Sequence, residues 1–155
     1  MEHKTEVRAD YLEKVTGKAM FVTDMVVPGM AYARLIRSTH AHAKIVAIDV
    51  TEAQALPGVL GVFSGEDLER LFGDNFRWGL YFKDRPVIAK DYVRYVGEPV
   101  VAIVATTEAI AEDATDYVDI QYEPLPHVNA FDEAMAPDAP LVHQEFEPIE
   151  NFYFH

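Results

Sequence analysis

His40 and His42 are the side chains with the clearest capacity for metal chemistry. They stand two residues apart in the stretch THAHA, so in an extended strand both rings point the same way and could hold a metal with a third ligand. The spacing along the chain indicates no third ligand. We therefore interpret both histidines as structural residues at a strand edge. We expect structural or solvated roles for three other histidines, His127, His143 and His155.

Glu98 is the acid best placed for acid–base catalysis. It lies in Gly97-Glu98-Pro99, a break between the β-like runs YVRYV and PVVAIVA, and a carboxylate held beside such a turn could be fixed for proton transfer. A structural interpretation fits better, because Gly97 permits a positive φ and Pro99 has no amide hydrogen to leave unpaired. The sequence positions no base or nucleophile beside Glu98. We therefore predict no catalytic residue, no cofactor-binding residue and no metal ligand in this chain.

Several common catalytic signatures are missing. The chain has no cysteine, which excludes disulfides, thiolate metal sites and iron–sulfur ligation by its own residues. It contains no G-x-G-x-x-G, no P-loop and no H-E-x-x-H motif. Its two serines, Ser38 and Ser64, do not lie in G-x-S-x-G, so a serine hydrolase is excluded too.

The charge balance argues against nucleic acid as a partner. The chain contains 13 Lys and Arg and 26 Asp and Glu, which gives a net charge of −13. The cations form no cluster that could displace phosphate counterions. We interpret the acids as a solubilising surface, including a solvated helix face at Glu112, Asp113 and Asp116.

The chain has neither a signal-like start nor an apolar run long enough to cross a membrane. We therefore expect a cytoplasmic protein without a membrane partner.

Hydrophobic patterns predict several strands. Residues 30–39, 44–50 and 59–63 have strand patterns, and within 44–50 alternation would place Val46, Ile48 and Val50 on one face. Further strands are expected at residues 86–89, 92–96, 99–105 and 119–126. The run 99–105 lacks polar alternation, which indicates a strand covered on both faces. In 119–126, Ile120 and Tyr122 should point inward.

Short helices are expected between these strands. Thr51 and Gln54 fit a capping box, Ser64 offers a cap for residues 66–72, and Gly73 suits the end of that helix. Thr107 is a plausible cap for a helix over 108–118, and residues 131–135 could add one more turn. The only tryptophan, Trp78, lies in a loop-like segment, 74–82, whose aromatic side chains we expect to pack inward.

Three stretches of the chain resemble one enzyme family: KVTGKAMFVTDMVVPGMAYARLIRS, LIRSTHAHAKIVAIDVTEAQALPGVLGVFSGEDL and VRYVGEPVVAIVA. They are similar, in the same order, to the N-terminal α/β-hammerhead domain of the molybdenum hydroxylase large subunit, in the xanthine dehydrogenase, aldehyde oxidase and carbon monoxide dehydrogenase group. The resemblance runs from about Arg8 to the tail. It implies an α+β fold with mixed sheets and two or three short helices. Strands in that fold cross and swap sheets, and the break at Gly97-Glu98-Pro99 would lie between two of them.

The resemblance also implies a domain organisation. Residues 1–16 would form an N-terminal arm and 17–137 the hammerhead domain. Residues 138–155 would form a tail leading toward a molybdopterin-binding region that this chain lacks. With Met1 just before the domain, the arrangement resembles the prokaryotic one, in which the subunits are separate chains. Aromatic residues of the tail would face a partner rather than solvent: Phe146, Phe152, Tyr153 and Phe154.

The function implied is that of a non-catalytic domain within a molybdenum-cofactor-dependent oxidoreductase. In the family, the residues that hold molybdopterin, molybdenum and the glutamate base lie downstream of this domain, so this chain alone is expected to be inactive and to hold no cofactor. It would pack against the molybdopterin-binding domains. In the complete enzyme a molybdenum-bound hydroxide attacks the substrate carbon and electrons leave through 2Fe-2S clusters to FAD. Iron–sulfur and FAD subunits are therefore implied as further partners.

Two other functions are considered. The chain could be a free-standing hammerhead module that binds a protein or a small ligand without redox activity. The downstream reading frame distinguishes this module from a part of the enzyme, because the enzyme requires a molybdopterin-binding continuation. A weaker hypothesis gives this domain its own acid–base activity at Glu98, which a Glu98→Gln variant tests.

Overall fold

The computed structural model describes residues 8–79 and 83–144. The chain divides into two compact units, Met1–Met30 and Ala31–His155, and each is described by itself.

The first unit contains little regular structure. It has a short helix, α1 (Tyr11–Val15), and one turn of 3-10 helix, η1 (Val22–Asp24), and neither contains a buried residue. Its apolar side chains are exposed: Tyr11, Leu12, Val15, Met20, Phe21, Val22, Met25, Val26 and Val27.

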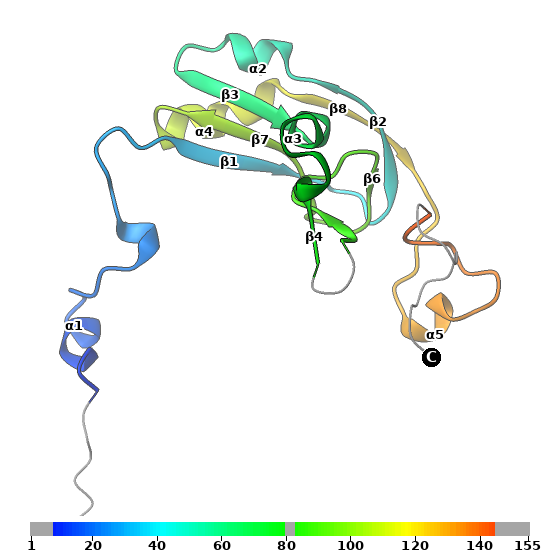
Figure 1. The fold of residues 1–155 in the computed structure, drawn as a ribbon, viewed down its shortest axis with the longest axis horizontal. Helices are drawn as coiled ribbons and strands as arrows, with labels where there is room; N and C mark the ends of the chain where they lie inside the picture. The colour runs from blue at the N-terminus through cyan, green and yellow to red at the C-terminus, as the bar shows by residue number, and fades with distance from the viewer. Residues whose placement is uncertain (1–7, 80–82, 145–155) are drawn as a thin grey trace, which may run out of the picture. The chain divides into compact units, whose positions relative to one another are not determined.

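The larger sheet of the second unit is built around one buried strand. β7 (Pro99–Ala105) lies between β1 (Tyr32–Arg37) and β3 (Val59–Ser64), and both pairs are antiparallel (Figure 1). Val100, Val101, Ile103 and Ala105 of β7 have no exposed surface, so side chains on both of its faces are covered. The prediction of a strand buried on both faces is confirmed.

A second sheet has β2 (Ala43–Asp49) at its centre, between β6 (Tyr92–Val93) and β8 (Asp119–Pro124). Ile120 and Tyr122 of β8 pack against the core, as predicted. The predicted face of β2 is wrong, because the register with β8 shifts between Ile45 and Ala47. This bulge leaves Val46 57% exposed and turns Ile45 and Ile48 toward the core.

Consecutive strands alternate between the two sheets. The chain passes from β1 to β2 to β3, and later from β6 to β7, and each step changes sheets. The crossing from β6 to β7 contains Gly97, whose φ is +95°. This confirms the expected position of the break between two strands. The predicted strand over 92–96 is wrong in length, because pairing stops at Val93 and the chain turns.

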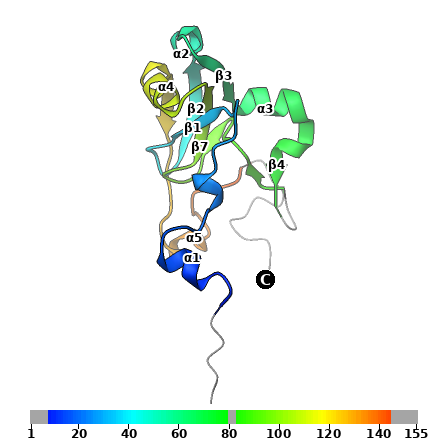
Figure 2. The ribbon, with the colours of Figure 1, turned by 90° about the vertical axis from the view of Figure 1, so that its left-hand side faces the viewer.

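Short helices cover the two sheets. α4 (Glu108–Asp113) packs against β1 and β7, and α3 (Gly65–Phe72) packs against β3; Figure 2 shows them on opposite sides of the strands. Ser64 and Thr107 cap α3 and α4 as predicted, with Ser64 Oγ accepting from the Asp67 amide and Thr107 Oγ1 from the Ile110 amide. The predicted helix over 108–118 continues after α4 as a 3-10 turn, η3 (Ala114–Tyr117).

The predicted capping box at Thr51 is wrong. The helix α2 (Thr51–Ala55) begins at Thr51 itself, its N-cap residue is Val50, and no side chain caps it in the predicted way. The Thr51 amide instead donates to Asp49 Oδ1 at 2.9 Å, because β2 ends with that carboxylate beside the first turn. Hydrogen bonds from the Thr51 side chain and backbone lower the pKa of Asp49.

After α3, the chain forms a small two-stranded ribbon. It consists of η2 (Gly73–Phe76), β4 (Arg77–Trp78) and β5 (Arg85–Pro86). The expectation that aromatic residues here pack inward holds for Phe76, which is 3% exposed, but not for Trp78, which is 58% exposed. β5 is a two-residue strand where four residues were predicted. A last helix, α5 (Phe131–Ala134), follows β8.

The core is formed where both sheets meet the helices. It contains Ala43, Ala53, Val62, Val93 and Ile103, with the half-buried Ile36, Ile45, Leu56, Val118 and Tyr122 packed against it. The α+β class predicted from the sequence is confirmed. Within residues 8–79 and 83–144, no helix is long and apolar enough to span a bilayer.

Candidate functional site

Glu98 is buried in the turn that connects the two sheets. Its side chain is 5% exposed, and its Oε2 accepts a hydrogen bond from the Arg94 amide at 2.5 Å. The Glu98 amide donates to the Tyr95 carbonyl at 3.2 Å, so both the backbone and the side chain of Glu98 close the same loop. The carboxylate therefore stabilises the turn as a hydrogen-bond acceptor, whereas the structural interpretation from the sequence rested on Gly97 and Pro99.

The turn is also attached to the end of β1. The Ser38 amide donates to the Glu98 carbonyl at 2.8 Å, and the Gly97 amide donates to the Ser38 carbonyl at 2.8 Å. Ser38 is 3% exposed, and its hydroxyl pairs with both the amide and the carbonyl of His40, each at 3.0 Å. These hydrogen bonds fix the turn at both ends, because the groups that they join belong to the backbone or are themselves bonded to it.

His40 and His42 do not converge on one site. The His40 ring lies 4.8 Å from the Tyr122 ring, centroid to centroid. His42 Nδ1 lies 2.7 Å from the Pro126 carbonyl oxygen, which can only accept, so Nδ1 carries the proton. Burial raises the pKa of Tyr122, while its hydrogen bond with Ser38 opposes that shift. These are the contacts of packed side chains and support the structural interpretation of both histidines.

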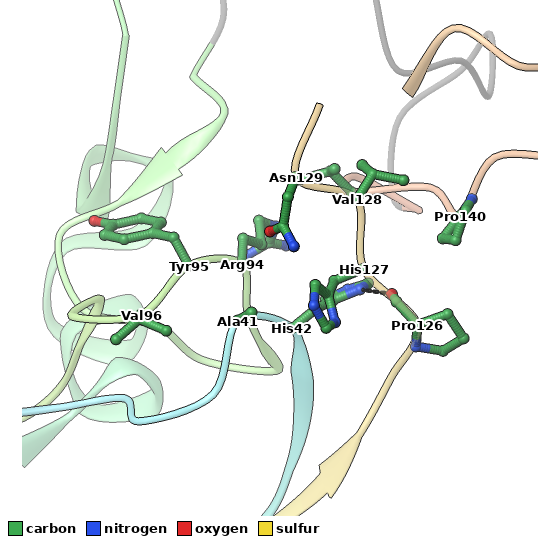
Figure 3. A pocket seen from close by; sticks show the side chains of 11 residues that line it. Ala41, His42, Arg94, Tyr95, Val96, Pro126, His127, Val128, Asn129 and Pro140 are labelled. Carbon is green, nitrogen blue, oxygen red and sulfur yellow. Dashed lines mark hydrogen bonds between the residues drawn. The ribbon is translucent and has the colours of Figure 1, made fainter. Parts of the chain in front are cut away.

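Two cavities flank the turn. One, of about 310 Å³, lies between the turn and the segment after β8, and His42, Arg94, His127 and Asn129 line it (Figure 3). The other, of about 430 Å³, is lined by Trp78, Arg85, Tyr95 and Glu98, among others. Arg94, Tyr95 and Val142 line both cavities. In Figure 3 the Tyr95 ring points away from His42, so the turn presents different side chains to its two sides.

The surface around the turn is apolar and aromatic. Trp78, Val87, Tyr95 and Val96 are 58, 52, 56 and 65% exposed. The Arg85 guanidinium stacks over the Trp78 ring at 5.5 Å from its centroid. Tryptophan, tyrosine and arginine are the residues that most often dominate protein–protein binding energy. The arrangement therefore fits a contact surface better than a catalytic site.

The described residues do not fit a molybdenum centre. Within residues 8–79 and 83–144, no three His, Cys, Asp or Glu side chains come together in a way that could hold a metal ion. The larger cavity is lined by Asp84 and Glu98 but also by Arg85 and Arg94, so its charges give no preference for the phosphate of a molybdopterin. We derive no chemical step through that cofactor.

The other residues considered from the sequence are dispersed. Glu112 binds Arg34 of β1 at 2.5 Å, and Asp113 and Asp116 lie away from both cavities. His127 lines the smaller cavity and His143 the larger one. Five residues lie outside the described part: Phe146, Phe152, Tyr153, Phe154 and His155.

Three residues of the turn were not predicted as functional from the sequence. They are Arg94, Tyr95 and Val96, which lie between the two cavities or at their edges. The signal that could have found them is the stretch RYVGEP, where an arginine, a tyrosine and a valine precede the Gly-Glu-Pro break.

Residues 16–126 match the family model described as "Aldehyde oxidase and xanthine dehydrogenase, a/b hammerhead domain". A probable xanthine dehydrogenase subunit from Bacillus subtilis is 34% identical over 97% of this chain and 20% of its own length. The large molybdopterin subunit of nicotinate dehydrogenase from Eubacterium barkeri is 37% identical over 90% of this chain and 32% of its own. The chain thus spans between a fifth and a third of these two curated relatives.

Solved structures agree with the sequence matches. A reconstituted CO dehydrogenase from Oligotropha carboxidovorans superposes with a TM-score of 0.79 and 37% identity, covering 87% of this chain and 17% of that one. The aldehyde oxidoreductase from Desulfovibrio gigas gives a TM-score of 0.78 and 28% identity, over 95% of this chain and 17% of that one.

Proposed function

The chain belongs to the family of aldehyde oxidase and xanthine dehydrogenase hammerhead domains, and we propose that it is the non-catalytic N-terminal domain of a molybdenum-dependent oxidoreductase large subunit. One observation carries the proposal. Nearly the whole chain, 97% of it, aligns with only 20% of a probable xanthine dehydrogenase subunit. A domain that occupies so small a share of its relatives is expected to support chemistry performed by the remainder.

In this proposal the domain packs against the molybdopterin-binding part of the large subunit. The hammerhead domain comprises residues 17–137, with the arm at 1–16 and the tail at 138–155 leading toward the molybdopterin-binding part. None of its residues is catalytic, binds a cofactor or ligates a metal. The complete enzyme would contain a molybdenum cofactor, which supplies the oxidation chemistry, and would associate with 2Fe-2S and FAD subunits in the cytoplasm.

The structure offers support through its exposed apolar surface. Trp78, Tyr95 and Val96 in the second unit have more than half of their surface exposed, and many apolar residues of the first unit are exposed as well. Large apolar side chains gathered on a surface usually mark an interface. A domain that packs within a larger protein has such surfaces when it is considered alone.

Purification of the protein from its native source tests the proposal. An affinity tag on this chain should recover a complex, or a single longer polypeptide, that contains molybdenum, iron and flavin in measurable ratios. Metal analysis and flavin absorbance quantify the three cofactors. Recovery of this chain with none of them would refute the proposal and favour the free-standing binding module. An untagged culture taken through the same purification controls for adventitious metal.

A further inference from the structure

The turn between β6 and β7 and the neighbouring β4–β5 ribbon together present a surface that the proposed function does not specify. We call it the turn surface and define it as Trp78, Arg85, Val87, Tyr95 and Val96. The four apolar members are all more than half exposed, and Arg85 is exposed and stacks over Trp78. The two cavities of about 310 and 430 Å³ on either side of the turn give this surface depressions that a partner's side chains can fill.

The turn beneath this surface is held in place before any partner arrives. The Glu98 carboxylate fixes the Arg94 amide, and two backbone hydrogen bonds join Ser38 to Gly97 and Glu98. Tyr95 and Val96 lie between these fixed points. A loop that is already fixed loses little conformational entropy when it binds a partner, and this explains the burial of Glu98.

The path of the chain indicates what covers the surface. Val142 lines both cavities and His143 lines the larger one. The polypeptide therefore runs along the turn surface as it approaches the end of the described part. In the two curated relatives between two thirds and four fifths of the polypeptide lies outside the region that this chain matches, since the chain covers 32% and 20% of them. In the large subunit proposed above, polypeptide of that size would follow the tail and could cover this surface.

We propose that the turn surface is the face through which this domain packs against the molybdopterin-binding part of the large subunit. This inference rests on the proposed function and adds the position of the contact. The covering surface should carry apolar side chains that enter the two cavities and an acceptor that faces Arg85. The exposed bulge at Val46, in the middle of β2, should stay outside the contact.

Cysteine labelling tests the position directly, because the chain has no cysteine of its own. Val96→Cys is placed on the turn surface, and Val46→Cys, whose parent residue is similarly exposed at 57% against 65%, is the matched control. Each variant is treated with a maleimide twice, once as the isolated chain and once in the complex or longer polypeptide that contains the molybdopterin-binding part. Mass spectrometry of the peptide that contains the new cysteine measures the rate. In the complex, Val96→Cys should react at least about tenfold more slowly than alone, since the core of an interface excludes solvent.

A binding measurement provides a second test. Tyr95→Ala should weaken the association by about 30-fold or more if Tyr95 is an anchor of the interface. Tyr117→Ala removes a comparable ring, 46% exposed on η3, and should leave the affinity unchanged. Circular dichroism of both variants verifies that each is folded.

The outcomes separate the two proposals. If this chain is recovered neither in a complex nor in a longer polypeptide that contains molybdopterin, the proposed function fails and this inference fails with it. If the complex forms and Val96→Cys reacts as fast within it as in the isolated chain, the proposed function stands and the turn surface is excluded as the contact. Unchanged affinity of Tyr95→Ala would also overturn the inference.

Discussion

Glu98 and Arg94 are joined by a hydrogen bond from the backbone amide of Arg94 to the side chain of Glu98. The Glu98 Oε2 accepts from the Arg94 amide at 2.5 Å, which closes a loop of five residues between two sheets. Because Glu98 is 5% exposed, removing it takes from the Arg94 amide an acceptor that is shielded from bulk water. The acid that was the best candidate for catalysis therefore has a structural task, and this leads to the first prediction.

Glu98→Ala should destabilise the chain more than Glu98→Gln. The alanine variant leaves the Arg94 amide without its acceptor, at a cost of about 1–3 kcal/mol, whereas the glutamine carbonyl can still accept from it. Urea denaturation of the wild type and both variants measures the difference. In the complete enzyme, Glu98→Gln should retain turnover. A folded Glu98→Gln variant that lost most of its turnover would show that Glu98 takes part in the chemistry.

The sequence predicted most strands and caps because their causes are local. Ser64 and Thr107 cap helices with their own hydroxyls, and the apolar run of β7 shows its burial directly. The same reasoning failed where a tertiary contact determines the local conformation. The bulge at Val46 depends on the register with β8, more than seventy residues later in the chain, which no local pattern reveals.

The turn surface, too, could be predicted from the sequence only in part. The sequence located the break at Gly97-Glu98-Pro99 and its structural purpose. It did not indicate that Trp78, which was expected to pack inward, and Tyr95 lie beside one cavity. That arrangement arises because the β4–β5 ribbon lies beside the turn. The two residues are seventeen positions apart in the sequence, so only the tertiary fold brings them to one surface.

The bulge in β2 gives the second prediction. Ile45→Ala should lower the free energy of unfolding by about 2 kcal/mol, because Ile45 packs against the core. Val46→Ala should change it by no more than about 0.5 kcal/mol, because Val46 is exposed on the bulge. Thermal or urea denaturation of both variants tests the register. The reverse order of costs would show that β2 follows the regular alternation predicted from its sequence.

Two glycines differ in what surrounds them, which gives the third prediction. A Cβ on Gly65, at the start of α3, would lie 2.5 Å from the Ala89 carbonyl oxygen, and backbone there cannot yield easily. Gly65→Ala should therefore destabilise the chain by about 1–3 kcal/mol. A Cβ on Gly61 would meet the Phe63 ring at 2.9 Å, and that side chain can rotate aside. Gly61→Ala is the matched control and should cost less. Equal costs measured by urea denaturation would contradict this account of the packing at Gly65.

The cap of α3 makes the stability of the domain depend on pH, which gives the fourth prediction. Asp67 Oδ2 accepts from the Ser64 amide at 2.9 Å and from the Ser64 hydroxyl at 2.8 Å, and Arg70 lies 2.7 Å from Oδ1. The backbone hydrogen bond from Ser64 is the main cause that lowers the pKa of Asp67 below its ordinary value of 3.8, although partial burial opposes it.

A group whose pKa is lowered by folding stabilises the folded state when it is ionised. The contribution of Asp67 is therefore present above its ordinary pKa and is lost as the pH falls through its lowered pKa in the folded chain. Asp67→Asn should cost about 1 kcal/mol near neutral pH and should make the loss of stability in acid less steep. Glu66→Gln, which removes another acid of the same helical turn, should keep the steep loss of the wild type. Urea denaturation at several pH values from about 6 down to about 2 measures both effects. If the stability of Asp67→Asn fell as steeply with decreasing pH as that of the wild type, other carboxyl groups would determine the acid sensitivity of this domain.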